Sequence, residues 1–257
     1  IFYVKASALT EAAALPGIAV DGIACHVGSQ LTSLDVFERA ARALLSLASD
    51  LTQDGIAVSH LDLGGGLGLG DPQSPSPGID AYVRRLIDTL DEAGDRGFEI
   101  VIEPGRSIVA AAGVLLTRVH YLKDNGTRHF AIVDAGMNDL IRPALYGAEQ
   151  PVENVRGEGV DPIVCDVVGP VCESADFLAR ERRLAVAPGD LLAVGEAGAY
   201  GASMSSQYNA RPRGAEVLVS GGTAHLVRER ETIADLMRGE HLLHGSPGGP
   251  LSNRAGR

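Results

Sequence analysis

A glycine run in the first third of the chain is the first candidate for chemistry. Leu63-Gly64-Gly65-Gly66-Leu67-Gly68 follows a predicted strand and precedes a predicted helix. Because glycine has no Cβ, the N–H groups of this loop could approach a phosphate closely, and the alternative is a tight turn without a ligand. The spacing does not match the dinucleotide-binding pattern, and no Gly-Lys-Ser/Thr follows to make a Walker motif. We therefore expect a phosphate cradle of another type.

A tetrapeptide of mixed charge, Glu103-Pro104-Gly105-Arg106, follows the next predicted strand. The guanidinium of arginine suits a carboxylate or a phosphate, and a nearby glutamate could pair with a protonated ring nitrogen. A structural Glu–Arg pair is the alternative. His26, within the segment Cys25–Gln30, ends an earlier strand, where a lone histidine is more often structural than catalytic.

Three segments in the second half of the chain place reactive side chains beside prolines or glycines. They are residues 141–146, with Arg142 and Tyr146, residues 169–174, with Cys172 and Glu173, and residues 198–201, with Tyr200. Each of them could be an ordinary loop or a packing element. Together they offer a thiol, a carboxylate, arginines and tyrosines, a set that suits an amino acid better than a nucleotide or a sugar.

The first hundred residues repeat one plan, in which a short apolar strand is followed by a glycine-bearing loop and an amphipathic helix. Strands are predicted at residues 22–27, 60–63 and 98–102, and their ends at His26, Gly64 and Glu103 lie 38 and 39 residues apart. This regular spacing is expected of βα units in a parallel sheet or barrel. In such folds the chemistry gathers at the carboxyl ends of the strands.

Two helices are predicted between these strands. Asp35 is the expected N-cap of the first helix, and Gly55 is expected to end it. The apolar stripe of the first helix is Phe37, Ala41, Leu44, Leu45, Ala48 and Leu51. That of the second is Ile79, Val83, Leu86, Ile87 and Leu90.

From about residue 114 the pattern changes to short β-branched segments separated by turns. Strands are predicted at residues 114–122, 129–134, 163–168, 191–194 and 215–219, and one helical stretch at 231–238. This pattern favours a second, mostly antiparallel β domain, with a boundary near residues 107–114.

The composition excludes several classes of protein. The chain has 257 residues, of which 45% are hydrophobic and 21% charged, and this is typical of a globular protein. A net charge of -11 opposes binding to nucleic acid or to an anionic membrane surface, and no apolar stretch approaches the length of a membrane span. With no such stretch and no basic-then-apolar leader, we expect a cytoplasmic location. The three cysteines, Cys25, Cys165 and Cys172, fit neither a disulfide scaffold nor a zinc site, so we expect no metal.

Six motifs, in order and spacing, resemble the diaminopimelate decarboxylases, which are pyridoxal-phosphate-dependent amino-acid decarboxylases. They are residues 26–30, 61–68, 103–106, 142–146, 169–173 and 199–201, and the resemblance covers about residues 17 to 240. It implies an α/β plus β fold: the C-terminal part of a pyridoxal-phosphate-binding (β/α)8 barrel over residues 1–110, then a mostly antiparallel β domain over 111–240. Residues 241–257 are expected to form a disordered tail. The resemblance also implies a homodimer with shared active sites.

The resemblance implies a role for each motif. The cofactor would be bound by His26, which stacks on its ring, and by Ser29, Gly64, Gly65, Gly66, Glu103, Gly105, Arg106 and Tyr200. The substrate would be bound by Arg106, Arg142, Tyr146, Glu173 and Tyr200. Cys172 would be the catalytic proton donor, supplied across the dimer. The implied reaction is decarboxylation of meso-2,6-diaminopimelate to L-lysine, the last step of lysine biosynthesis.

The sequence also departs from the family. Only about three βα units precede the β domain, where a barrel has eight, so we expect activity only in a longer parent protein. Lys5 lies 21 residues before His26, too close for the family's cofactor lysine, and residues 1–15 are better interpreted as a helix. The alternatives are a decarboxylase for ornithine or arginine, and an inactive fragment that acts as a cofactor-binding or interaction module.

Overall fold

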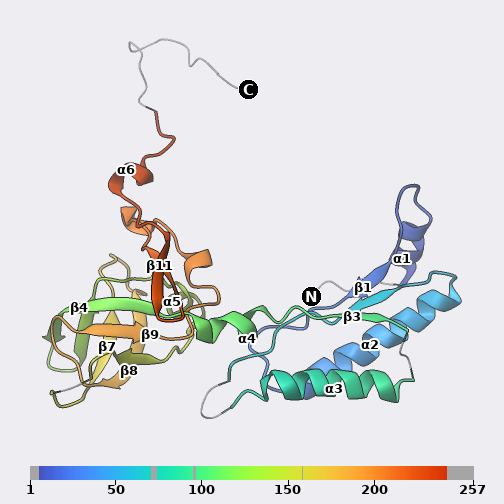
Figure 1. The fold of residues 1–257 in the computed structure, drawn as a ribbon, viewed down its shortest axis with the longest axis horizontal. Helices are drawn as coiled ribbons and strands as arrows, with labels where there is room; N and C mark the ends of the chain where they lie inside the picture. Colours follow the sequence, from blue (N-terminus) through green and yellow to red (C-terminus); the bar gives the residue numbers. More distant parts are fainter. Residues whose placement is uncertain (1–5, 71–73, 95–96, 158, 242–257) are drawn as a thin grey trace, which may run out of the picture.

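The computed structural model describes residues 6–70, 74–94, 97–157 and 159–241. Its elements form an N-terminal lobe, up to residue 104, and a C-terminal lobe from residue 113, joined by a short helical connection (Figure 1). Lys5 lies outside the described residues, as does nearly all of the expected tail. The predicted boundary at residue 110 stays a prediction, and it falls within the connection between the lobes.

The N-terminal lobe is a three-stranded parallel sheet with helices, as the βα spacing predicted. The strand order is β1-β2-β3, and His60 of β2 pairs with Gly22 of β1 and with Glu99 of β3. The strands are shorter than predicted. The elements in chain order are α1 (Ala6–Ala13), β1 (Gly22–Ala24), α2 (Leu34–Gln53), β2 (His60–Asp62), α3 (Gly78–Glu92) and β3 (Glu99–Val101).

Helices α2 and α3 pack together beside this sheet. The predicted α2 stripe is buried except for the half-buried Leu45, and the Phe37 ring meets the Tyr82 ring edge-on at 4.8 Å between centroids. The α3 prediction was partly wrong, because Ile79 and Ile87 are exposed and Tyr82 lies in the core. The buried face of α3 includes Tyr82, and a prediction based on aliphatic residues alone could not identify that face.

The predicted N-cap of α2 was also wrong. Helix α2 begins at Leu34 with Ser33 as its N-cap, and Asp35 lies in the first turn. The carboxylate of Asp35 accepts a hydrogen bond from the Arg85 guanidinium at 3.1 Å, and Glu38 accepts another from the same arginine at 2.8 Å. The two acids of α2 therefore join it to α3.

The connection between the lobes consists of α4 (Gly105–Val109) and the 3-10 helix η1 (Ala110–Ala112). It is fixed to the C-terminal lobe by hydrogen bonds from the Ala197 N–H to the Gly113 carbonyl and from the Gly198 N–H to the Ala110 carbonyl. A Cβ on Gly198 would lie 1.9 Å from the Val109 carbonyl oxygen. Only glycine permits this close approach.

The C-terminal lobe is a six-stranded sheet with the order β6-β9-β4-β5-β7-β8. Neighbouring strands are antiparallel except β5 and β7, so the prediction of a mostly antiparallel domain is confirmed. The end strands β6 and β8 approach each other, and the sheet curls into a nearly closed barrel. The strands are β4 (Leu115–Asp124), β5 (His129–Val133), β6 (Val152–Asn154), β7 (Ile163–Val168), β8 (Phe177–Leu184) and β9 (Leu191–Val194).

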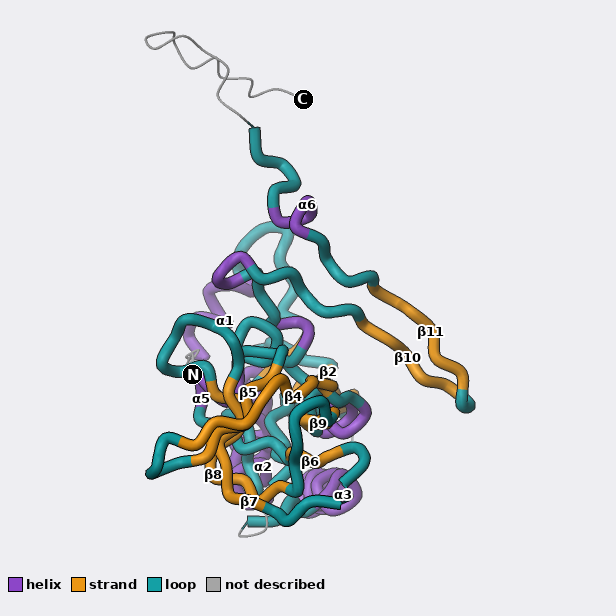
Figure 2. The backbone as a smooth tube through the Cα atoms, turned by 90° about the vertical axis from the view of Figure 1, so that its left-hand side faces the viewer, coloured by secondary structure: helices purple, strands orange, loops and turns teal. Residues whose placement is uncertain are grey.

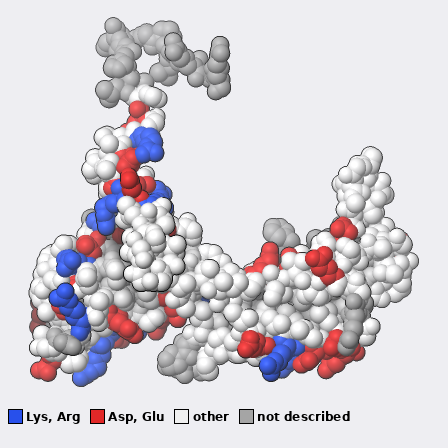
Figure 3. All heavy atoms as spheres, in the orientation of Figure 1, with Lys and Arg blue, Asp and Glu red and all other residues white. Residues whose placement is uncertain are grey.

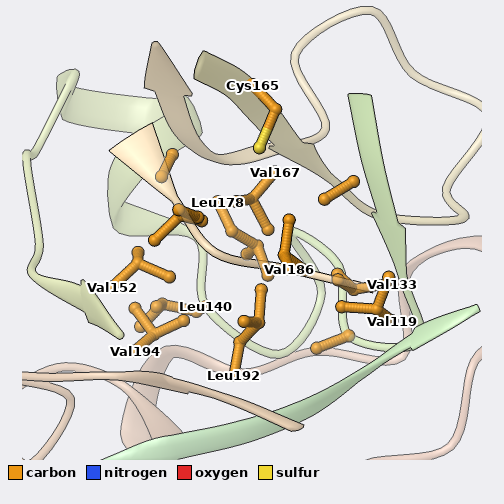
Figure 4. Close-up of a cluster of buried hydrophobic side chains, with 14 residues drawn as sticks. Val119, Val133, Leu140, Val152, Cys165, Val167, Leu178, Val186, Leu192 and Val194 are labelled. Atoms are coloured by element: carbon orange, nitrogen blue, oxygen red, sulfur yellow. The ribbon is translucent and has the colours of Figure 1, made fainter. Parts of the chain in front are cut away.

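Aliphatic side chains fill this barrel (Figure 4). Val119, Val133, Val167, Leu192 and Val194 are at most 1% exposed, and the Cys165 side chain lies among them. Burial raises the pKa of the Cys165 thiol, with a smaller effect from Asp166. Cys165 is therefore a packing residue.

A separate hairpin of β10 (Glu216–Ser220) and β11 (Thr223–Arg228) extends away from the barrel (Figure 2). It is followed by α6 (Ile233–Leu236), which is shorter than the helix predicted at 231–238. Thr232 begins α6 with a capping box, in which its hydroxyl accepts from the Asp235 N–H.

Acidic and basic side chains are interspersed on the face seen in Figure 3, and they form no continuous basic surface. Over the part of the chain that the structure describes, no helix is long and apolar enough to cross a membrane.

Candidate active site

The candidate site begins at the carboxyl ends of the three parallel strands, where backbone pairing continues beyond the strands. The Cys25 N–H donates to the Asp62 carbonyl at 2.9 Å, and the Glu103 N–H donates to the Gly64 carbonyl at 2.8 Å. His26, the glycine run and Glu103 therefore lie at one edge of the sheet, as the spacing of the strand ends predicted.

The three glycines are required by the close approach of neighbouring backbones. A Cβ on Gly64 would lie 2.2 Å from the Cys25 carbonyl oxygen, and one on Gly65 would lie 2.1 Å from the Glu103 carbonyl oxygen. A Cβ on Gly66 would meet the Gly28 carbonyl at 2.2 Å, and its φ of 106° is unfavourable for other residues. No side chain fits between these loops.

The N–H groups of the run are used unequally. The Gly64 N–H donates to the Asp62 carboxylate at 2.8 Å. Among the described residues, the N–H groups of Gly65 and Gly66 donate to no protein acceptor. These two N–H groups could therefore donate to a ligand.

The predicted alternative of a structural Glu–Arg pair within residues 103–106 is not present. Glu103 and His26 are exposed, and neither side chain forms a hydrogen bond or an ion pair with another described residue. Arg106 donates from Nη2 to the Ser29 hydroxyl at 3.2 Å instead. Arg106 therefore connects α4 to the segment that follows His26.

Two arginines and two tyrosines, one from the connection between the lobes and three from the C-terminal lobe, lie close together, and we call them the arginine–tyrosine cluster: Arg106, Arg142, Tyr146 and Tyr200. The Arg106 guanidinium carbon is 4.8 Å from the centroid of the Tyr200 ring, and that of Arg142 is 5.5 Å from the same centroid. Arg142 is also 5.0 Å from the centroid of the Tyr146 ring. Both contacts of Arg142 are within the range of a cation–π interaction.

Local structure brings the members of the cluster together. Arg142 and Tyr146 lie four residues apart in α5 (Arg142–Tyr146), so they share one helix face. Pro143 stabilises the first turn of α5, and Gly147 ends the helix in the left-handed conformation with φ 62°. Tyr200 has φ 57°, an unfavourable value for an aromatic residue, and such strain is common at functional sites.

The cluster has two positive charges, and Glu196 opposes them only in part. Burial lowers the pKa of Arg106, and the neighbouring charge of Arg142 lowers it further. Burial raises the pKa of Glu196, an effect that Arg106 opposes. Among the described residues, neither arginine forms an ion pair with a carboxylate, so the cluster is suited to bind an anion.

Cys172 and Glu173 lie in the loop between β7 and β8, and both are exposed. The Glu173 carboxylate accepts hydrogen bonds from the Ser174 hydroxyl at 3.2 Å and from the Tyr208 hydroxyl at 3.4 Å. The Ser174 hydroxyl is the main cause of the lowered pKa of Glu173, with contributions from the N–H groups of Ala175 and Ser174 and from Tyr208. Within the described part of this chain, neither residue contacts the arginine–tyrosine cluster.

A protein-family model described as pyridoxal-dependent decarboxylase, C-terminal sheet domain, matches residues 3–198. The chain belongs to this decarboxylase family. A curated diaminopimelate decarboxylase of Pseudomonas aeruginosa is 54% identical over 233 residues, which are 91% of this chain and 55% of that protein. The chain thus spans little more than half the length of this relative.

Solved structures give the same relationship. The diaminopimelate decarboxylase of M. jannaschii in co-complex with L-lysine has a TM-score of 0.88 at 36% identity, over 92% of this chain and 55% of that one. The lysine/ornithine decarboxylase of Vibrio vulnificus, complexed with cadaverine, has a TM-score of 0.72 at 26% identity, over 81% of this chain and 56% of that one. The predicted family and the predicted fold, part of a barrel followed by a β domain, are confirmed.

Sequence reasoning missed two residues that support the site. Tyr208, which donates to Glu173, lies outside every motif, and its contact joins residues 35 positions apart in the sequence. Asp176 closes the loop that carries Cys172 and Glu173 by accepting a hydrogen bond from the Val171 N–H, and no signal in the sequence marked it. Among the described residues, no group of three metal-ligating side chains converges.

Proposed function

We propose that the full-length protein containing this chain decarboxylates meso-2,6-diaminopimelate to L-lysine with pyridoxal phosphate as its cofactor. The observation that carries the proposal is the pair of guanidinium groups beside the Tyr200 ring, which form no ion pair with a carboxylate in the described chain. Two adjacent cations suit a ligand with several anionic groups. The cofactor phosphate and the substrate carboxylates are such groups.

The residues at the strand edge fit the cofactor. A glycine run without room for a Cβ, with two N–H groups that are not used internally, is suited to a phosphate. The phosphate and ring would be held by His26, Ser29, Gly64, Gly65, Gly66, Glu103, Gly105, Arg106 and Tyr200. When bound, pyridoxal phosphate supplies an electron sink for the negative charge left on carbon as CO2 departs.

The proposed substrate has an amino acid at each end, so the site must recognise a zwitterion that does not react. In the proposal, Arg106, Arg142 and Tyr146 bind carboxylate, and Glu173 binds the distal ammonium. The lowered pKa of Glu173 keeps it anionic, as this role requires. Ornithine and lysine have no distal carboxylate and would leave a cation of the site unpaired, which disfavours them.

Cys172 is the proposed proton donor. Loss of CO2 leaves a carbon that must gain one proton, and the Cys172 thiol can supply it and then regain a proton from solvent. Its exposed position in a loop fits a group that completes a site on another chain. We therefore include in the proposal a cytoplasmic homodimer in which Cys172 and Glu173 enter the partner's site.

A comparison of substrates tests the proposal. Full-length protein loaded with pyridoxal phosphate should release CO2 from meso-diaminopimelate with a kcat/KM far above that for ornithine, arginine or lysine. A higher kcat/KM for ornithine or arginine would favour the alternative activity. No release from any of the four would favour the non-catalytic module.

A further inference from the structure

Asp176 is a buried carboxylate that no sequence motif drew attention to. It lies in the loop between β7 and β8 and is 4% exposed. Its Oδ1 accepts a hydrogen bond from the Met137 N–H at 2.6 Å, and its Oδ2 accepts one from the Val171 N–H at 2.7 Å. One carboxylate thus joins two loops that are distant in the sequence.

Two glycines make room for this carboxylate. A Cβ on Gly169 would lie 2.5 Å from Asp176 Oδ2, and a Cβ on Gly136 would lie 3.1 Å from Oδ1 and 2.9 Å from a methyl group of Val171. The carboxylate is enclosed on both sides by backbone without side chains. Its position therefore has little freedom.

The hydrogen bonds of Asp176 determine the path of the backbone through Cys172 and Glu173. Val171, which is held by Oδ2, directly precedes Cys172. The loop closes on itself through the Glu173 N–H, which donates to the Val171 carbonyl at 2.8 Å, and the Asp176 N–H, which donates to the Glu173 carbonyl at 3.1 Å. Asp176 thus fixes both ends of the turn that presents the thiol and the carboxylate.

The exposed side chains of Cys172 and Glu173 have little packing of their own to hold them. Within the described chain, the Glu173 carboxylate is restrained by hydrogen bonds from the Ser174 and Tyr208 hydroxyls and from the backbone N–H groups of Ser174 and Ala175, and the last two belong to the same turn. Where these two groups lie thus depends on the backbone of their turn. Burial of the Asp176 carboxylate, which raises its pKa, is costly, and a loop without a positional requirement would not need it.

We propose that Asp176 is a positioning residue that holds Cys172 and Glu173 in the geometry needed for proton donation and substrate recognition. This inference rests on the proposed function, because it acts through the two residues assigned there. An error of about 1 Å in the position of a catalytic group can lower the rate about a hundredfold.

The first test is Asp176→Asn in full-length enzyme loaded with pyridoxal phosphate. An amide has one oxygen to accept with, so it can satisfy only one of the two N–H groups and turns its own N–H groups toward the other. We expect kcat/KM for meso-diaminopimelate to fall about a hundredfold. The affinity for pyridoxal phosphate should not change, because the cofactor residues lie on other loops.

Asp190→Ala, which removes a carboxylate that accepts hydrogen bonds elsewhere in the same lobe, is the control for lost stability. Asp190 Oδ2 also accepts two hydrogen bonds, from Asn154 Nδ2 at 2.7 Å and from the Ala187 N–H at 2.8 Å, in a turn that carries no candidate site residue. It should lower the thermal midpoint without lowering kcat/KM. An equal loss of kcat/KM in both variants would overturn the inference, since Asp176 would then act through stability alone.

A second variant covers the case in which Asp176→Asn does not fold. Gly136→Ala crowds Asp176 Oδ1 without removing the charge, and it should lower kcat/KM in the same direction by a smaller factor. The rate at which iodoacetamide alkylates Cys172, followed by mass spectrometry, should differ from wild type in each folded variant. If kcat/KM and this alkylation rate both stay at the wild-type values, the inference is wrong.

The alkylation rate also separates this inference from the proposed function. It needs neither substrate nor turnover, so it reports the position of the Cys172 turn even if the wild-type protein releases no CO2 from diaminopimelate. An inactive wild type with altered Cys172 alkylation in Asp176→Asn would refute the activity and leave the positioning role standing.

Discussion

The substitution Arg142→Met removes one of the two cations from the arginine–tyrosine cluster. Methionine keeps much of the length of the side chain and can still pack against the Tyr146 and Tyr200 rings, so the change is mainly one of charge. In the proposed function the lost charge is the partner of a substrate carboxylate. We expect a lower kcat/KM for meso-diaminopimelate in the full-length enzyme.

The exposure of the cluster limits the size of this effect. Removing the partner of a desolvated charge costs about 2–5 kcal/mol. Tyr146 and Tyr200 are 62% and 46% exposed in this chain, so solvent screens the cluster and the lower value applies. A loss of about 2 kcal/mol corresponds to about a 30-fold lower kcat/KM for meso-diaminopimelate.

The assay compares kcat/KM for meso-diaminopimelate with kcat/KM for ornithine. Because the unpaired cation that penalises ornithine is gone, the ratio of the two values should fall along with the activity on diaminopimelate. Arg180→Met is the matched control, since the Arg180 guanidinium carbon also lies against an aromatic ring, 4.0 Å from the centroid of Phe177, and within the described chain it makes no cation–π contact with Tyr146 or Tyr200. An unchanged ratio in Arg142→Met would refute the role of Arg142 in reading a distal carboxylate.

Three further predictions concern other parts of the chain. In the full-length enzyme, Cys172→Ala should lower kcat by orders of magnitude while the visible absorbance of bound cofactor persists; turnover equal to wild type would assign this thiol to another role. Gly198→Ala should lower the free energy of unfolding by about 1–3 kcal/mol in urea titrations, because its Cβ meets the Val109 carbonyl, whereas Gly214→Ala, with open space around it, should not. Hydrogen bonds from the Arg213 N–H and Gln207 lower the pKa of Glu231 from 4.5 to about 2, so its stabilisation is complete above pH 4.5 and is lost as the pH falls toward 2. Over this pH range, the thermal midpoint of Glu231→Gln should fall less steeply with decreasing pH than that of the wild type. Equal slopes would contradict the stabilising role of the Glu231 carboxylate.

The order of the elements in the N-terminal lobe could be predicted because each strand there is a short apolar run that ends in a glycine or a charged residue. The buried face of α2 could be predicted because its apolar residues recur at the spacing of a helix. The strand lengths could not be predicted, since pairing beyond Ala24 and Asp62 continues as single hydrogen bonds rather than as a ladder. The buried Tyr82 was missed because tyrosine also occurs on surfaces.

Strand β8 shows why some elements of the C-terminal lobe were missed. Its sequence from Arg180 to Arg183 is a run of charged residues, which suggests a solvated loop, yet it pairs with β7 as an edge strand with bulges. Charged residues are tolerated there because one side of an edge strand faces solvent. The short strand β6 and the partner strand β11 carry similarly weak signals.

Motifs identified the candidate site better than they explained its geometry. The resemblance named Arg106, Arg142 and Tyr200 together, but nothing in the sequence indicated that both guanidinium groups would lie beside one ring. The Ser29 contact of Arg106 joins residues 77 positions apart in the sequence, and the left-handed backbone of Tyr200 is not indicated by its residue type. Such relations depend on tertiary packing and are not local properties of the chain.

The most direct test of the proposed activity is the stoichiometry of the reaction in full-length protein reconstituted with pyridoxal phosphate. Each mole of meso-diaminopimelate consumed should yield one mole of CO2 and one mole of L-lysine, and protein stripped of the cofactor should yield neither. Diaminopimelate that is recovered intact after incubation with the cofactor-loaded protein would contradict the proposed function.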